Sequence, residues 1–416
     1  MKLRRFLRIV GPGLLFASMA IGTSHLVLST QAGARFGGWM ILPILLANLL
    51  KYPFFEFGVR YTQVTKTSLI EGYQKRGGFI FWSYALITLV SSFTILAALY
   101  TVTGGLLINM FPEWPFNLTE TVLGLFGLLS LMLIVGRYKL MENALKVVVS
   151  SLFISLIITT VLVLNKGARL PVENFVTEPL WTEGGVLFLI ALIGWMPTAV
   201  EASAWVSMWN LEKYKSLDQK PSLKETLTEF NFGYWMTAFL AVLFLLIGWY
   251  TLYGSGVDLS PSAVKFADQL TRLFTVHMGE WTYPLIAFAA FATMLSSCMS
   301  AHDALARVLV DMKDKIKSNA KKESQGFAVS VLLLALINGF VVYSFQANMG
   351  QLVTLATFVS FVFAPLLGWM NLKNVYGKEF DQQHLPSGPM RLLARLGIVF
   401  LTLFALYYAA LFLDLI

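Results

Sequence analysis

Long apolar segments, separated by short polar ones, follow one another along almost the whole chain. A helix that crosses a bilayer needs about 20 mostly apolar residues, because it must cover about 30 Å of hydrocarbon. By this measure the sequence predicts eleven membrane-spanning helices and therefore an all-α, polytopic membrane protein. They are 9–33, 39–59, 79–110, 119–136, 144–164, 185–209, 231–254, 279–305, 326–345, 350–372 and 392–413.

The composition supports a membrane protein. Of the 416 residues, 57% are apolar and only 13% are charged, whereas an average soluble domain carries about 25% charged residues. These values argue against a soluble enzyme, a disordered chain and a coiled coil. The one cysteine, Cys298, excludes a disulfide framework and a metal site built from cysteines.

The basic residues orient the predicted helices. Of the 31 lysines and arginines, 25 fall on the side that holds the N-terminus, five fall on the other side, and Lys51 lies inside a span. The positive-inside rule then places the N-terminus in the cytoplasm and the C-terminus outside, in a plasma membrane or a bacterial inner membrane. We interpret the net charge of +8 as a topology signal with anionic lipid as the partner, and we expect no binding of nucleic acid.

Two predicted spans are interrupted near their middle. The span 9–33 contains Gly22-Thr23-Ser24-His25, and the span 185–209 contains Gly194-Trp195-Met196-Pro197-Thr198. Glycine and proline weaken a helix by about 1 and 3 kcal/mol relative to alanine, and in lipid each freed backbone group needs another partner. Interruptions at corresponding places in two halves are typical of transporters with inverted repeats. The alternative is a proline kink with small residues for close helix packing.

The position of these interruptions divides the chain. Residues 1–167, with the first five spans, form one predicted repeat, and residues 168–378, with the next five, form the second. Residues 379–416 add an eleventh span, and the whole forms one membrane domain. We expect a substrate site at mid-membrane, between the two broken helices.

Several segments resemble the NRAMP family of divalent-metal transporters. They are Gly11-Pro12, Gln31-Ala32-Gly33-Ala34-Arg35-Phe36-Gly37, Leu46-Ala47-Asn48-Leu49 and Met196-Pro197. The resemblance implies a LeuT-type fold with a 5+5 inverted repeat plus one helix, and secondary active transport by alternating access. In that family the uptake of Mn²⁺ or Fe²⁺ is coupled to protons.

The departures from the family bear on the substrate. The family's Asp-Pro-Gly-Asn aligns with Gly22-Thr23-Ser24-His25, so the metal-binding Asp and Asn are both absent. Thr198 replaces the His of the family's Met-Pro-His, and Thr357 stands where the family has a metal-facing Gln. No Asp or Glu lies between Gly77 and Phe111, where the family carries carboxylates for proton traffic. We therefore expect the scaffold without the usual metal site.

The candidate substrate-binding residues carry no negative charge. They are Gly22, Thr23, Ser24, His25, Trp195, Met196, Thr198 and Thr357. The N-termini of the half-helices after both breaks favour an anionic group, so a small organic or amino-acid-like substrate is the preferred prediction. The alternative is a divalent metal ion held by the ring of His25 and the sulfur of Met196.

Other polar residues within spans are candidates for coupling or gating. By resemblance to sodium-coupled proteins of the LeuT-type fold, the hydroxyls of Ser296, Ser297 and Ser300 could bind Na⁺, although they could equally serve helix packing. Glu201 could carry a proton, act as a gate or form an internal ion pair. Asp303, with the neighbouring His302 and Arg307, could form a gate network or lie solvated at the interface.

The sequence leaves the roles of two charged residues and the coupling ion undecided, and it argues against a cofactor and an enzyme. Lys51 and Glu56 in the span 39–59 are interpreted as structural pairs with other helices, or as snorkelling side chains. The coupling ion could be Na⁺ or H⁺, or there could be none, and we expect no cofactor and a monomer. The chain lacks His-Glu-x-x-His, Gly-x-Ser-x-Gly, Walker and Rossmann signatures, which argues against an enzyme.

Overall fold

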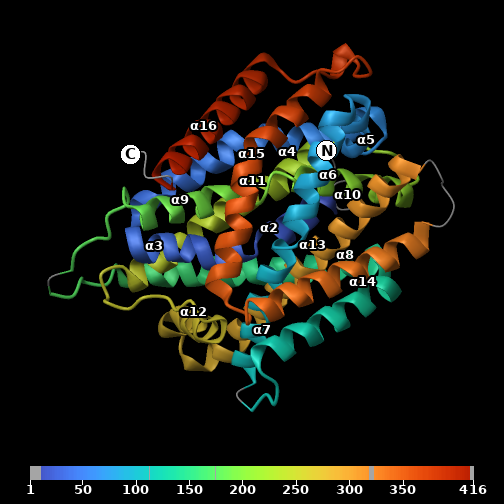
Figure 1. Cartoon of the computed structure of the whole chain (residues 1–416). Helices are drawn as coiled ribbons and strands as arrows, with labels where there is room; N and C mark the ends of the chain where they lie inside the picture. The colour runs from blue at the N-terminus through green and yellow to red at the C-terminus, as the bar shows by residue number, and fades with distance from the viewer. Residues whose placement is uncertain (1–10, 112, 174, 318–322, 413–416) are drawn as a thin grey trace.

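The computed structural model describes residues 11–111, 113–173, 175–317 and 323–412. This part of the chain is a helical bundle (Figure 1). Its first half contains α2 (Pro12–Ala20), η1 (Ser24–Ser29), α3 (Thr30–Phe36), η2 (Gly38–Met40), α4 (Ile41–Thr65), α5 (Leu69–Lys75), α6 (Gly78–Ser92), α7 (Ile95–Met110) and α8 (Leu118–Lys166). Its second half contains α9 (Glu183–Trp195), α10 (Ala202–Ser216), α11 (Leu223–Leu252), α12 (Ala263–Met278), η3 (Glu280–Thr282), α13 (Tyr283–Lys317), α14 (Glu323–Ser344), α15 (Met349–Val375), η4 (Gln382–His384) and α16 (Gly388–Phe412).

The helices match the predicted spans closely. Eight helices of the described residues are long and apolar enough to cross a membrane, and the bent pair Pro12–Ala20 with Ser24–Phe36 makes nine. The predicted spans 144–164 and 185–209 overlap in part the shorter apolar helices Phe153–Lys166 and Glu183–Trp195. The all-helical membrane fold is therefore confirmed, whereas the number of eleven spans stays a prediction.

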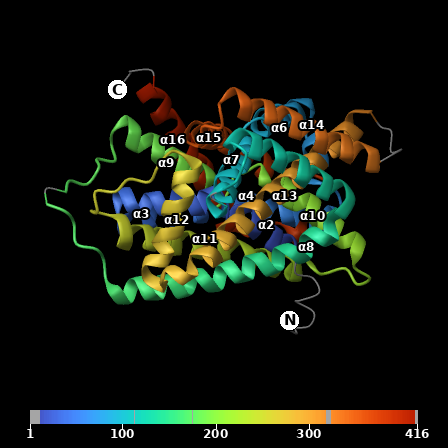
Figure 2. The same ribbon diagram turned by 90° about the horizontal axis from the view of Figure 1, so that it is seen from below.

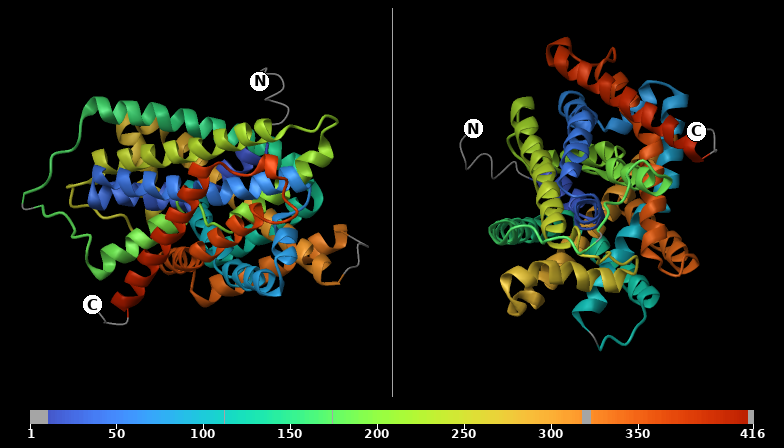
Figure 3. Two further views of the ribbon diagram at one scale, coloured as in Figure 1. Left: turned by 90° about the horizontal axis from the view of Figure 1, so that it is seen from above. Right: turned by 90° about the vertical axis from the view of Figure 1, so that its left-hand side faces the viewer.

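The outer surface of the bundle is apolar, as lipid requires. Along α16 the exposed large side chains recur at three- and four-residue intervals, which places them on one face. They are Leu392, Leu396, Val399, Leu403 and Leu406. The opposite side of α16 packs against α15 and α4 at the edge of the bundle (Figure 3). Charged side chains such as Lys51, Glu56 and Glu201 are instead buried inside.

Some predicted loops are helical. The polar stretch 137–143 lies inside α8, a continuous helix of 49 residues whose teal and green arms run in different directions in Figure 2. Residues 137–146 contain no glycine or proline, so nothing local ends the helix there. The predicted loop 255–278 contains α12, and α13 continues to Lys317, beyond the predicted span end at residue 305.

The third span, predicted as one segment, is divided into α6 and α7. The side chain of Asn338 on α14 fills the gap: its amide donates to the carbonyl of Ser92 (2.7 Å), and its oxygen accepts from the N–H of Ala97 (3.1 Å). The hydroxyls of Ser92 and Thr94 also donate to backbone carbonyls in this turn. Such side-chain bonds compete with the helical pattern, and Asn338 keeps the freed groups satisfied within the membrane.

Both halves of the first span pack directly against α11. A Cβ atom on Gly233 of α11 would overlap the carbonyl of Gly13, and one on Gly248 would overlap the carbonyl of Thr30. Glycine is therefore required at these two contacts. The carboxylate of Glu229 on α11 also accepts hydrogen bonds from the N–H groups of Gly11 (2.9 Å) and Gly13 (2.8 Å), at the start of α2.

Candidate substrate site

The two predicted breaks exist and face one another. Between Ala20 and Ser24 the first span bends by 48°. The sixth span is interrupted between the end of α9 at Trp195 and the start of α10 at Ala202. The Ser24 hydroxyl lies 3.3 Å from the carbonyl oxygen of Pro197, so the two breaks are in direct contact.

A small cavity lies between the breaks. Its volume is about 20 Å³, which is room for about one water molecule. Four of the predicted site residues line it: Thr23, Ser24, Trp195 and Thr198. Apolar side chains of α7, α10 and α13 complete the wall, among them Leu99 and Trp205.

The other predicted substrate residues lie next to this cavity. Gly22 packs against α13, where a Cβ atom would lie 3.1 Å from the hydroxyl oxygen of Ser297. Thr357 of α15 packs behind α9, and its hydroxyl donates to the carbonyl of Val353 at 2.8 Å. Met196 is fully buried at the end of α9. None of these three forms part of the wall as the structure describes it.

His25 links the first span to α11. Its Nε2 atom lies 3.0 Å from the carbonyl oxygen of Thr237, and its Nδ1 atom lies 2.7 Å from the hydroxyl oxygen of Ser24. A carbonyl can only accept, so Nε2 carries a hydrogen and donates it. Both ring nitrogens are therefore occupied by protein groups in this conformation.

Lys51 of α4 lies at the break in the sixth span. Its side chain is fully buried, and its ammonium donates to the carbonyls of Ile193 (3.0 Å), Gly194 (2.9 Å) and Thr198 (2.9 Å). These carbonyls belong to the C-terminal end of α9 and the break after it, where the helix dipole is negative. Three acceptors around the nitrogen match the three N–H bonds of an ammonium group, so the head group of Lys51 fills the carbonyls at this end of the break.

The contacts of Lys51 could not be identified from the sequence. We predicted a structural pair with another helix or a snorkelling side chain, and the structure shows a contact of the first kind, with backbone carbonyls of α9 and of the break after it. The available signal was a lysine near the middle of an apolar span, which is expensive unless it has a specific partner. The partner could not be identified, because every residue carries a backbone carbonyl and the sequence does not show which carbonyls the folded chain brings close to Lys51.

On the other side of the break, backbone N–H groups are free. Within the described chain, no protein group accepts a hydrogen bond from the N–H of Thr198 or Ala199, and both residues line the cavity. The hydroxyl oxygen of Thr23 is buried there without a hydrogen-bond partner. The cavity thus offers unused donors at the N-terminal side of α10.

The predicted serines of α13 join this helix to α2. The hydroxyl of Ser18 donates to the hydroxyl of Ser296 (2.9 Å), and the hydroxyl of Ser297 donates to the carbonyl of Ser18 (2.8 Å). The hydroxyl of Ser300 donates to the carbonyl of Ser296 at 2.8 Å. In this conformation all three predicted serine hydroxyls are engaged in hydrogen bonds with the protein.

Asp303 forms a network between α13 and α10. Its carboxylate accepts two hydrogen bonds from Arg307 (2.7 and 3.0 Å) and one from the indole of Trp209 (3.1 Å). Arg307 also reaches Glu212 of α10, with 3.5 Å between Nη1 and Oε2. His302 is held apart from this network, between the phenol of Tyr100 and the carbonyl of Val331.

Larger cavities lie at the two ends of the bundle. At one end, two cavities of about 200 and 430 Å³ lie beside Arg35. The cavity at the other end, of about 820 Å³, is lined by Lys66, Glu71, Arg307 and Lys315 among others, and we call this the basic end. The small central cavity between them makes this a conformation with a closed substrate site.

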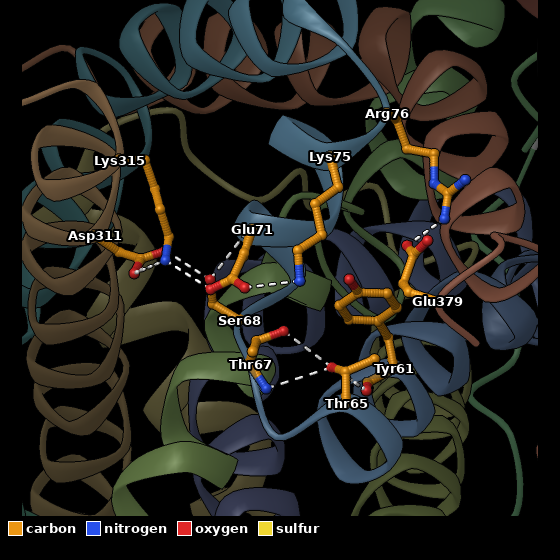
Figure 4. Close-up of polar contacts among 10 residues, drawn as sticks. All are labelled: Tyr61, Thr65, Thr67, Ser68, Glu71, Lys75, Arg76, Asp311, Lys315 and Glu379. Atoms are coloured by element: carbon orange, nitrogen blue, oxygen red, sulfur yellow. Dashed lines mark hydrogen bonds and ion pairs between the residues drawn. The ribbon is translucent and has the colours of Figure 1, made fainter. Parts of the chain in front are cut away.

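A polar network joins α5 to α13 at the basic end (Figure 4). The hydroxyl of Ser68 donates to Asp311 (2.7 Å), and Lys315 donates to Glu71 (2.7 Å), which also pairs with Lys75 (2.8 Å). Burial alone would raise the pKa of Glu71, but the hydrogen bonds from Lys315 and Lys75 outweigh it and lower that pKa below its usual value. Arg76 pairs with Glu379 beyond α15.

A helical membrane bundle whose first and sixth spans are broken around a small central cavity has the architecture of the LeuT-type fold. Solved structures of other transporters are similar to this chain in fold. The manganese transporter of Eremococcus coleocola, in complex with an aromatic bis-isothiourea substituted compound, superposes with a TM-score of 0.71 at 14% identity, covering 97% of this chain and 86% of that one. MhsT in complex with L-phenylalanine gives a TM-score of 0.64 at 15% identity, over 94% of this chain and 98% of that one. At these identities the likeness shows the fold alone.

The chain belongs to the Nramp family. The model of that family, described as natural resistance-associated macrophage protein-like, matches residues 13–410. An uncharacterized protein of Pasteurella multocida (strain Pm70) is 30% identical over 404 residues, which cover 96% of this chain and 92% of that protein. The family consists of membrane transporters and not enzymes, so the predicted resemblance and the predicted class of protein are confirmed.

Proposed function

We propose that this transporter carries a small organic solute with a carboxylate group, such as an amino acid, and not a divalent metal ion. The observation that supports the proposal most strongly is the position of Lys51. Its ammonium occupies the carbonyls of Ile193, Gly194 and Thr198, which are the groups that a cation at the broken sixth span would use.

The charge of the site disfavours a dication. A divalent ion near an ammonium group would be repelled by several kcal/mol at an effective dielectric constant of about 20. None of the described residues that line the central cavity carries a carboxylate. In the described part of the chain, no three His, Cys, Asp or Glu side chains are grouped so that they could hold a metal ion.

The same site suits a carboxylate. The unused N–H groups of Thr198 and Ala199 and the unpartnered hydroxyl of Thr23 are donors for its oxygens. Trp195 and Trp205 provide an apolar wall for the rest of the solute. Because the present cavity holds about one water molecule, the two breaks must move apart to admit a substrate.

A divalent metal is the second candidate, and the family favours it. One structural neighbour is a manganese transporter, whereas another is a complex with L-phenylalanine, so both kinds of substrate occur on this fold. A metal would use His25 and Met196 as ligands. His25 would first have to release Ser24 or Thr237, which it contacts in this conformation.

For the orientation we propose that the basic end faces the cytoplasm, on the strength of the 25-to-5 distribution of lysine and arginine. Substrate would then pass between the cavities near Arg35 and the cavity near Lys315. Na⁺ remains a candidate coupling ion, and it would require the hydroxyls of Ser296, Ser297 and Ser300 to exchange their present partners.

The test is a thermal-shift screen of the purified protein with L-amino acids, small carboxylates and MnCl₂, followed by uptake of the best ligands into proteoliposomes. We expect organic carboxylates to stabilise the wild type and to have no effect on Lys51→Met. Lys75→Met, which removes a half-exposed lysine at the basic end, is the matched control and should respond like the wild type. Stabilisation by Mn²⁺ alone, lost in Met196→Ala, would overturn the proposal.

A further inference from the structure

Glu201 differs from the other buried carboxylates of the bundle. Glu56 pairs with Arg60, Glu229 accepts two backbone N–H groups, and Asp303 pairs with Arg307. Glu201 is 2% exposed, its Oε1 atom has no hydrogen-bond partner, and no ion pair involves it in the described chain. An uncompensated charge at this depth is expensive, so the carboxyl group is neutral while the site is closed to water.

A stripe of polar side chains leads away from this carboxyl group along α6. Ser91 lies beside it, and Thr88 and Tyr84 follow at intervals of three and four residues, which places all three on one helix face. From residue 91 to residue 84 a helix rises about 10 Å. All three are buried. Within the described chain neither the hydroxyl of Thr88 nor that of Tyr84 forms a hydrogen bond of good geometry, although the two hydroxyls lie close to one another.

The stripe ends at the basic end. The phenol of Tyr84 is close enough to the carboxyl groups of Glu201 and Asp311 to interact electrostatically with both. Asp311 accepts a hydrogen bond from Ser68 and lines the cavity of about 820 Å³ beside Glu71 and Lys315 (Figure 4). These side chains therefore connect the broken sixth span with the cavity of about 820 Å³.

The neighbouring charged groups do not neutralise Glu201. On α5, Tyr73 packs against the ring of Tyr84 with 4.8 Å between the centroids, and its hydroxyl donates to Asn371. Lys51 on α4 uses its donors on three carbonyls. On α13, Arg307 is bound to Asp303, and Asp311 lies beyond Tyr84.

We propose that Glu201 is a proton-binding site of this transporter and that water along Thr88 and Tyr84 connects it to Asp311 and the basic end. Buried polar groups without a partner each cost about 1–3 kcal/mol, and water that enters beside α6 during a conformational change would satisfy them. When the path fills, the O–H bond of the Glu201 carboxyl breaks, the proton passes to water as hydronium, and the carboxylate keeps the electron pair. Re-protonation reverses these steps. This inference rests on the family's transport function and not on the carboxylate substrate.

The first test is infrared difference spectroscopy of the reconstituted protein after a pH jump, which needs no substrate. The wild type should show a pH-dependent C=O stretching band of a protonated carboxyl group. The band should be absent in Glu201→Gln, which keeps the shape of the side chain, and shifted in Glu201→Asp. An unchanged band in Glu201→Gln would overturn the proposal, whatever the substrate proves to be.

The second test addresses the path. In Thr88→Val and Tyr84→Phe the band should respond to the jump at least about tenfold more slowly than in the wild type, which corresponds to about 1.4 kcal/mol of barrier. The control is Thr101→Val on α7, a fully buried threonine whose hydroxyl is satisfied by the carbonyl of Ala97. Equal rates in Thr88→Val and Thr101→Val would exclude a path along α6.

Discussion

The ammonium nitrogen of Lys51 lies 2.9 Å from the carbonyl oxygen of Gly194, although 143 residues separate them in the chain. This contact joins α4 to the broken end of α9, beside the cavity where substrate is expected. The lysine side chain thereby fills the carbonyls of Ile193, Gly194 and Thr198 at that end of the break.

Lys51→Met should lower the free energy of unfolding by about 2–4 kcal/mol, because three buried carbonyls lose their donor. Monovalent or divalent cations should then recover part of the lost stability, since the freed carbonyls can bind them. Thermal unfolding of the variant in NaCl, KCl and MnCl₂ measures both effects. Lys75→Met should show neither, and a Lys51→Met variant as stable as the wild type would refute the assigned contacts.

Gly233→Ala should destabilise the protein by about 3 kcal/mol or more, because the new methyl group would overlap the backbone carbonyl of Gly13. Gly124→Ala provides the comparison, since a Cβ atom on Gly124 in α8 meets nothing within 4 Å. That change should be neutral or stabilise by up to about 1 kcal/mol, through the better helix propensity of alanine. Denaturation of both variants in the same detergent decides whether α2 and α11 are in backbone contact.

Glu229→Ala should loosen α2, whose first N–H groups at Gly11 and Gly13 bind this carboxylate. We expect a loss of about 1–2 kcal/mol and faster hydrogen exchange of the amides of residues 11–20. Glu229→Gln keeps an acceptor oxygen and should lie between the wild type and the alanine variant. Exchange unchanged in Glu229→Ala would mean that α2 is held by its packing alone.

The pH dependence of stability should contain a contribution from Glu71. Its pKa is lowered in the folded protein, so the folded state binds this proton less readily than the unfolded chain does. The contribution is fully present above the ordinary value of 4.5 and is lost as the pH falls through the lowered pKa. Lys315→Met removes one hydrogen bond to Glu71, and acid unfolding of this variant should depend less steeply on pH in that range.

Much of the fold could be predicted because its determinants are local or periodic. Apolar length predicted where the helices lie, and the glycine, proline and polar residues around Ser24 and Pro197 predicted both broken helices. Thr23, Ser24, Trp195 and Thr198 line the central cavity as expected. The resemblance of short motifs indicated the family, which the comparisons confirm.

Other features depend on residues far apart in the chain. The division of the third span requires Asn338 of α14 to satisfy Ser92 and Ala97. No hydropathy pattern reports such a contact. The continuity of α8 through residues 137–143 shows the reverse: a polar stretch looks like a loop, although its residues are compatible with a helix.

The sequence by itself determined membrane residence, the helical class, the two breaks and the absence of the family's carboxylates from the first break. These follow from side-chain transfer energies and backbone preferences, which act residue by residue. Only the tertiary structure decided that Lys51 binds the carbonyls of the sixth-span break and that, within the described chain, Glu201 is a buried acid without an ion pair. Those outcomes depend on which backbone carbonyls and hydroxyls the packed helices bring within about 3 Å of a charge, and this geometry arises only after the bundle has assembled.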